Sequence, residues 1–150
     1  MITEEFVTNN VARWLRLGGW RVVAVDFPQA GTGVMLHPQP SGSPNQGALI
    51  PDIIAVLGSR VVLVESKDRF VRADFRKVHD ARVGTGLLDA VRHVLGGQAV
   101  DRVTYGAAMP DIESQYSKTR PYLAEVDFVW LVSAMGNVRV LYSSDGVDVD

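Results

Sequence analysis

The sequence predicts a single domain of the α/β class, and three observations support this prediction. Residues 53–57 and 61–64 are short, almost wholly apolar runs, as expected for strands that are covered on both faces. Longer segments between such runs have apolar residues three and four positions apart, which is the spacing of amphipathic helices. The 150 residues are 47% hydrophobic and 21% charged, a balance typical of a globular chain with one core.

The first predicted elements are a helix over residues 4–17 and a strand over residues 20–27. Thr3 can cap the helix, acidic residues fill its first turn, and two glycines can end it. The stretch after the strand is rich in proline and glycine and has no periodicity. A flexible loop is therefore predicted at about residues 28–48, and loops of this length in compact domains are usually functional or mobile.

The remaining elements complete the order helix, three strands, helical region, strand, helix and two strands. They are predicted, in chain order, as strands at residues 50–57 and 60–66, helices at 69–82 and 87–95, a strand at 102–108, a short helix at 110–118, and strands at 126–133 and 138–142. Pro110 is expected near the start of the short helix and Pro121 beyond its end. The last two strands are expected to form an antiparallel β-hairpin. No repeat or composition change marks a boundary, so residues 1–150 are expected to be one domain.

The composition excludes several classes of site. The chain has no cysteine, which excludes disulfides, zinc sites with thiolate ligands and a cysteine nucleophile. No apolar run approaches the roughly 20 residues that a membrane-spanning helix needs. The first ten residues are polar and acidic, unlike a secretory signal. We therefore expect a cytoplasmic protein without a membrane partner.

The most informative residues are Pro51-Asp52 and, thirteen positions after the aspartate, Glu65-Ser66-Lys67. Glu65 and Lys67 end an apolar strand and point to the same side of it, and Asp52 begins the preceding strand. If these two strands pair, the three charges meet at one end of the sheet. Carboxylate oxygens suit Mg²⁺, and a lysine beside them can orient or help deprotonate a water molecule. Taken one at a time, a turn aspartate and a strand-end ion pair are the more common interpretations.

Pro51, Asp52, Glu65 and Lys67 match the motif of the PD-(D/E)xK nuclease superfamily, which this sequence resembles over about residues 3–108. The resemblance implies a restriction-endonuclease-like fold, with an αβββαβ core in which helices flank a central mixed sheet. The C-terminal hairpin would be an addition to that core. In size the chain resembles Holliday-junction resolvases and compact repair or restriction-like nucleases.

The activity that this resemblance implies is Mg²⁺-dependent hydrolysis of phosphodiester bonds in DNA by an endonuclease. Asp52, Glu65 and the backbone carbonyl of Ser66 would hold Mg²⁺, for which Mn²⁺ would substitute, and Lys67 would orient or activate the attacking water. Whether the substrate is duplex, junction, single strand or RNA stays open.

Many members of the superfamily carry a further acidic residue on the first helix, where this chain offers Glu4 and Glu5. Counting 100° per residue, Glu4 lies near the apolar stripe of the helix and Glu5 lies well round its side. We therefore prefer Glu4 as the additional catalytic residue.

A basic strip follows the motif. Residues 67–82 carry six basic side chains against three aspartates, although the net charge of the chain is −2. The strip is either a solvated helix face or a contact surface for a phosphate backbone. The predicted nucleic-acid-binding residues are Arg69, Arg72, Arg76 and Lys77. The acidic balance weighs against a sequence-independent DNA binder and suits a nuclease that needs a specific site or a protein partner.

Other functions stay open at this point. One is a non-catalytic nucleic-acid-binding or assembly module that retains the nuclease fold, and another is an unrelated α/β domain with a small-molecule role. Resolvases act as dimers, so the resemblance also implies a homodimer or higher homo-oligomer, with the C-terminal strand pair as a candidate contact. Tyr105 and Tyr116 can be either core residues or surfaces on which bases stack. The three histidines lack metal-ligand spacing.

Overall fold

The computed structural model describes residues 2–26, 33–37 and 49–144. Most of the loop predicted at about 28–48 therefore lies outside the described residues. In the part that is described, Leu36 forms an antiparallel bridge with Leu49, and both side chains are buried. Among the described residues, no helix has the length and apolar character needed to cross a membrane.

The first helix, α1 (Glu4–Leu17), forms as the sequence predicts. The Thr3 hydroxyl accepts a hydrogen bond from the Phe6 N–H at 3.0 Å, which satisfies one of the amide groups that a helix start leaves unpaired. The helix buries an apolar stripe that includes Val7, Val11 and Leu15 against the sheet. This packing fixes which end of the sheet the acidic first turn approaches.

In the described part of the chain, a six-stranded mixed sheet forms the centre, and the strands lie side by side in the order in which they follow each other in the sequence. The strands are β1 (Arg21–Val25), β2 (Ile53–Leu57), β3 (Arg60–Ser66), β4 (Arg102–Pro110), β5 (Phe128–Val132) and β6 (Val138–Ser143). β4 runs parallel to β3 and to β5, and the other neighbours are antiparallel. The α/β class, the mixed sheet and the C-terminal antiparallel hairpin β5–β6 are thus confirmed.

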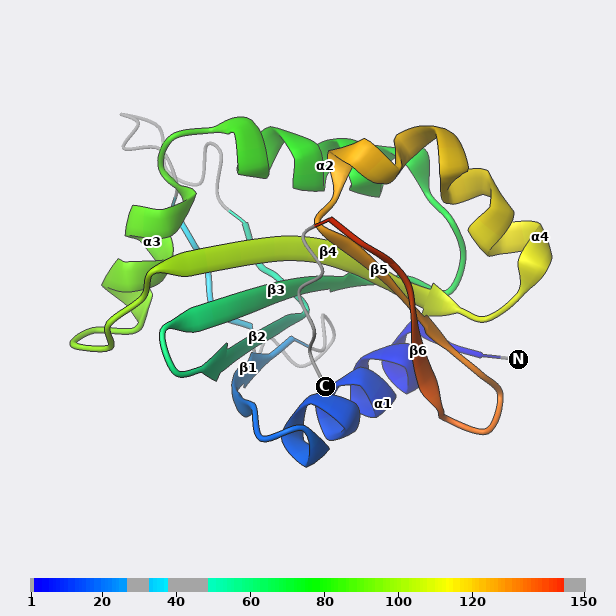
Figure 1. Ribbon diagram of the computed structural model, residues 1–150, viewed down its shortest axis with the longest axis horizontal. Coiled ribbons are helices and arrows are strands. Elements are labelled where there is room, and N and C mark those ends of the chain that lie inside the picture. Colours follow the sequence, from blue (N-terminus) through cyan, green and yellow to red (C-terminus); the bar gives the residue numbers. More distant parts are fainter. Residues whose placement is uncertain (1, 27–32, 38–48, 145–150) are drawn as a thin grey trace.

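Helices cover both faces of this sheet (Figure 1). α1 packs on one face, over a core that includes Trp20 and Trp130. The other face is covered by α2 (Arg72–Val83), α3 (Leu87–Val94), α4 (Glu113–Tyr116) and the 3₁₀ helix η1 (Ser117–Glu125). Two apolar cores therefore sandwich the strands, so that the described α/β unit is closed on both sides.

The start of α2 differs from the prediction, which placed it at residue 69. The helix begins at Arg72 because the preceding chain is held extended by contacts with a distant segment. The Phe70 N–H donates to the Gln115 side-chain oxygen at 3.1 Å, and the Phe70 ring stacks on that of Tyr122 with 5.9 Å between centroids. Arg69 therefore lies on the connection before the helix rather than on it.

The prediction for residues 110–118 is wrong in two details. Pro110 ends β4 rather than starting a helix, since it pairs in register with Val132 of the parallel strand β5. Pro121 lies inside η1 rather than beyond a helix end. A proline lacks the N–H that continuous helix requires, but short 3₁₀ turns with i→i+3 bonds can place it where no donor is needed. β2 and β5 also start later than predicted, at Ile53 and Phe128.

Candidate active site at the end of the central strands

The hairpin β2–β3 brings Asp52 and Glu65 to the same end of the sheet. Ile53, the first residue of β2, pairs with Val64 of β3. Asp52, which precedes Ile53, therefore lies opposite the end of β3. The Asp52 carboxylate accepts a hydrogen bond from the Ser66 N–H at 2.7 Å. Asp52 and Glu65 are both buried, each with 5% of its surface exposed. The structure thus brings together the two predicted metal ligands.

Two further side chains of the described residues contact the Glu65 carboxylate, and neither contact was predicted from the sequence. The Lys77 ammonium, from α2, donates to Oε1 at 3.3 Å and to Oε2 at 3.4 Å. The Tyr105 hydroxyl, from β4, donates to Oε2 at 3.3 Å. Tyr105 is fully buried, so its hydroxyl gives Glu65 a contact in the interior. Tyr105 is therefore a core residue and not a surface on which bases stack.

Lys67 lies beside a second pair of carboxylates. Its Nζ is 3.8 Å from Oε1 of Glu4 and 3.7 Å from Oδ2 of Asp74. Glu4 comes from the first turn of α1 and Asp74 from the first turn of α2, so helices from both faces of the sheet meet at this lysine. Glu5 is exposed. Of the two acidic residues considered on the first helix, Glu4 is the one that the structure places in the cluster.

The electrostatics of the cluster are dominated by burial of like charges. Burial, reinforced by the Glu65 charge, raises the pKa of Asp52 to about 7, against the stabilising effect of the Ser66 N–H. Burial also raises the pKa of Glu65, although Lys77 and Lys67 oppose the shift. Burial disfavours the charged form of Lys67, but its carboxylate neighbours outweigh that effect and raise its pKa. The cluster therefore holds excess negative charge that its lysines only partly offset.

The donor set of this cluster fits a divalent cation of the Mg²⁺ type. Four carboxylates (Glu4, Asp52, Glu65 and Asp74) face two ammonium groups, so the fully ionised cluster carries two uncompensated negative charges. The buried Ser66 hydroxyl oxygen has no hydrogen-bond partner among the described residues. Within the described ranges, no group of three or more acidic or histidine side chains is arranged to hold a metal. Mg²⁺ commonly uses only one or two carboxylates and keeps several waters, which suits Asp52 and Glu65.

The residues of the predicted nucleic-acid strip separate into two groups. Arg72 forms an ion pair with Glu125 at 2.8 Å and lies over the Tyr122 ring, and Lys77 contacts Glu65. The side chains of Arg69 and Arg76 are 66% and 68% exposed, and their ion pairs are with neighbouring surface aspartates. The strip is therefore only in part a free basic surface.

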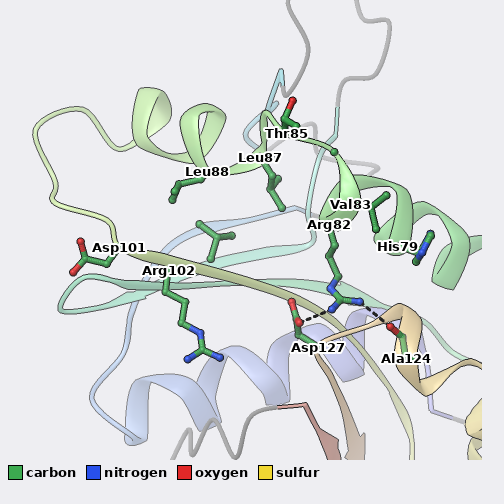
Figure 2. Close-up of a pocket in the computed structure, with 12 residues that line it drawn as sticks. His79, Arg82, Val83, Thr85, Leu87, Leu88, Asp101, Arg102, Ala124 and Asp127 are labelled. Carbon is green, nitrogen blue, oxygen red and sulfur yellow. Dashed lines mark hydrogen bonds and ion pairs between the residues drawn. The ribbon is translucent and has the colours of Figure 1, made fainter.

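A separate pocket of about 460 Å³ lies toward the other end of β4, between α2, α3 and the start of β5 (Figure 2). Arg82 points into it, bonded to Asp127 at 2.9 Å and to the Ala124 carbonyl at 3.1 Å. Apolar side chains such as Leu87 form part of its wall. Because Arg82 is bound within the wall and the acidic cluster lies elsewhere, we place the candidate active site at Asp52 and Glu65 and not in this pocket.

A signal for part of the missed geometry was present in the sequence. Asp74 and Lys77 are three residues apart on a helix, and each directly precedes one of the buried residues Phe75 and Val78, so the pair lies beside the face that meets the sheet. The role of Tyr105 had no such signal, because it depends on the parallel pairing of β4 with β3.

Comparisons of this chain with protein-family models, with curated proteins and with solved structures find no match.

Proposed function

We propose that the protein is a Mg²⁺-dependent DNA endonuclease with a restriction-endonuclease-like fold. The observation that carries the proposal is the adjacent, buried pair Asp52 and Glu65, with Lys67 and Lys77 at the same sheet end. Buried carboxylates without a cation are costly, and the motif to which they belong is the one that the sequence shares with this class of nuclease.

The order of elements supports the fold part of the proposal. α1, the strands β1, β2 and β3, the helical region of α2 and α3, and β4 follow each other in the order αβββαβ. β2 and β3 form the central hairpin that presents Asp52 and Glu65, and β4 adds to β3 in parallel. The hairpin of β5 and β6 then extends the sheet beyond this core.

Six residues at this end of the sheet have roles in the proposed reaction. Asp52, Glu65 and the Ser66 backbone carbonyl would hold the metal. When bound, Mg²⁺ supplies Lewis-acid polarisation of the scissile phosphate and charge stabilisation. Lys67 would orient the attacking water or donate to a phosphate oxygen, while Glu4, together with Asp74, would keep its ammonium in place.

The proposed DNA path passes α2, which carries Asp74 and Lys77 of the cluster, and η1, which contacts the start of α2. Arg69 and Arg76 are exposed there, and Lys118 and Arg120 are exposed on η1. Among the described residues, no carboxylate forms an ion pair with Lys118 or Arg120. Unpaired surface cations are available to phosphates without first losing a partner, so we add these two residues to the proposed contacts.

A homodimer belongs to the same proposal, with the hairpin β5–β6 as the contact. β6 is an edge strand, and Val140 on it is 41% exposed. An exposed edge can pair with the same edge of a second copy. Sedimentation analysis of the wild type and of Val140→Lys tests this: a dimer that dissociates in the variant supports the contact, and a monomeric wild type removes it.

The test of activity is cleavage of labelled duplex, nicked, flapped and four-way-junction DNA in Mg²⁺, Mn²⁺ or EDTA. We expect metal-dependent cutting that falls about a hundredfold or more in Lys67→Ala and in Asp52→Asn. Asp101→Asn is the matched control, because it removes an exposed carboxylate at the far end of β4. DNA binding without cleavage, unchanged in Asp52→Asn, would instead favour the non-catalytic binding module.

A further inference from the structure

Among the described residues, two side chains contact the Glu65 carboxylate, one charged and one neutral. Lys77 Nζ lies almost equally far from its two oxygens, at 3.3 and 3.4 Å, and thus faces the carboxylate as a chelated cation would. The Tyr105 hydroxyl contacts Oε2 alone, from the buried interior. The Glu65 side chain is only 7% exposed, so these contacts largely define its surroundings.

Lys77 is the only cation within ion-pair distance of Glu65 in the part of the chain that the structure describes. Lys67 lies with Glu4 and Asp74 instead, at 3.8 and 3.7 Å. The two lysines of the cluster therefore have separate positions. Of the two, Lys77 is the one that pairs directly with the Glu65 carboxylate.

We propose that the Lys77 ammonium occupies, in the metal-free protein, the position at Glu65 that a divalent cation takes, and that metal binding displaces it toward the nucleic-acid backbone. This inference rests on the metal site of the proposed function. In the metal-free protein, Lys77 on α2 would then neutralise part of the negative charge of the acidic cluster.

The contact of Lys77 is suited to displacement. Its distances exceed the roughly 2.7–2.9 Å of strong charge-assisted hydrogen bonds, and its side chain is 39% exposed. A lysine with a flexible stem can therefore move its charge into solvent or onto a phosphate. Tyr105 is fully buried and would stay, so Glu65 keeps one fixed contact while the cation is exchanged.

The competing interpretation is that Lys77 is a permanent partner that orients Glu65 for the metal. The two interpretations predict opposite changes in metal affinity when Lys77 is replaced by an uncharged residue. If Lys77 is a placeholder, meaning a cation that occupies the metal position until the metal binds, it competes with the metal, so removing it tightens metal binding. A permanent positioning residue assists the metal, so removing it weakens metal binding.

The experiment is a titration with Mn²⁺, followed by electron paramagnetic resonance of the free ion, without nucleic acid. We expect Lys77→Met to bind Mn²⁺ about tenfold more tightly than the wild type, or ~1.4 kcal/mol. We expect Lys77→Arg to bind it several-fold more weakly, because a guanidinium pairs with both carboxylate oxygens at once. Lys67→Met is the matched control for loss of one positive charge in the cluster, and it should tighten binding much less.

The outcomes separate this inference from the function on which it rests. If neither the wild type nor Lys77→Met binds Mn²⁺, the proposed metal-dependent function fails. If the wild type binds Mn²⁺ but Lys77→Met binds it no more tightly, or Lys67→Met gains as much, the placeholder is overturned while the metal site stands. Should Lys77→Met fail to fold, as judged by circular dichroism, Lys77→Arg decides alone, and unchanged or tighter binding by it counts against the inference.

Discussion

The carboxyl group of Asp52 is buried where its neutral form is more stable than its charged form, relative to the unfolded chain. Burial and the neighbouring Glu65 raise the pKa of Asp52 from 3.8 to about 7. The folded protein therefore binds this proton more tightly than the unfolded chain does. The stability of the metal-free protein falls as the pH rises from about 4 to about 7, and the loss is complete above that range.

The first prediction is that Asp52→Asn stabilises the metal-free protein at pH 8 while abolishing the proposed activity. The amide oxygen can still accept the Ser66 N–H, and the cost of the buried charge is removed. We expect a gain of about 2 kcal/mol in the free energy of unfolding, below the roughly 4 kcal/mol of a full three-unit shift. Urea unfolding in EDTA measures it at pH 8 and pH 4. A gain of the same size at both pH values would contradict the assigned cause, and Asp101→Asn is the control.

Tyr105 provides a second test at the scale of one residue. Tyr105→Phe removes only the hydroxyl that contacts Glu65. Residues that orient metal ligands typically contribute 10- to 100-fold to metal affinity, so we expect Mn²⁺ binding to weaken about tenfold. Tyr142→Phe, which removes a hydroxyl on the distant strand β6, should leave it unchanged. Calorimetric titration compares the two variants, and equal affinities would show that the Tyr105 hydroxyl serves packing alone.

At the scale of elements, η1 and the loop before α2 act together. Phe70 and Arg72 are held by Gln115, Tyr122 and Glu125 from the α4–η1 segment. This segment thus fixes where α2 begins, and with it the positions of the helical side chains that reach the cluster. The surface of η1 is therefore held against the start of α2, the helix that carries Asp74 and Lys77.

We predict that the double variant Lys118→Ala/Arg120→Ala weakens DNA binding and lowers its dependence on salt. Each lost phosphate contact reduces the slope of log affinity against log salt by about 0.9, so the pair should reduce it by about 2. Arg16→Ala removes an exposed cation near the C-terminal end of α1 and serves as the control. Fluorescence anisotropy in EDTA at several salt concentrations gives both slopes. An unchanged slope in the double variant would remove η1 from the DNA path.

An ion pair links β6 to Asp111, the residue that follows β4, in addition to the parallel pairing of β4 with β5. Arg139 donates to both oxygens of Asp111, at 2.7 and 2.9 Å, and these hydrogen bonds lower the pKa of Asp111. The pair therefore stabilises the fold above pH ~4 and is lost as the pH falls through the lowered pKa. We expect Asp111→Asn to cost up to about 1 kcal/mol at pH 7 and less at pH 2. Thermal unfolding at the two pH values checks this, and a cost of the same size in acid would point to packing instead.

At the scale of the whole molecule, metal binding should appear as stability. A ligand that binds only the folded state at a hundred times its dissociation constant adds about 2.7 kcal/mol, or roughly 5–10 °C in Tm for a domain of this size. We predict such a shift with Mn²⁺ for the wild type and for Asp101→Asn, and its loss in Glu65→Gln. Calorimetry of the three proteins measures it. A shift retained in Glu65→Gln would place the metal elsewhere.

The sequence was sufficient for features that depend on local pattern. The bounds of β3 at Arg60–Ser66 and the approach of Asp52 to Glu65 follow from apolar runs and a short turn. Features that depend on distant pairs were not predictable. The start of α2 is set by Gln115, forty-five positions from Phe70, and the Tyr105 contact needs the parallel register of β3 and β4. No local pattern carries that information.

The residues of the candidate site are synthesised at different times, because they lie far apart in the sequence. A growing chain that ends before β4 already holds Asp52, Glu65 and Lys67. It lacks Tyr105, the parallel strand behind Glu65 and the η1 segment that positions α2. Such a chain has the carboxylates and the lysine but not the strand and the helical segment that position them. The proposed nuclease would thus become competent only when translation has passed η1, well after Asp52, Glu65 and Lys67 have been made.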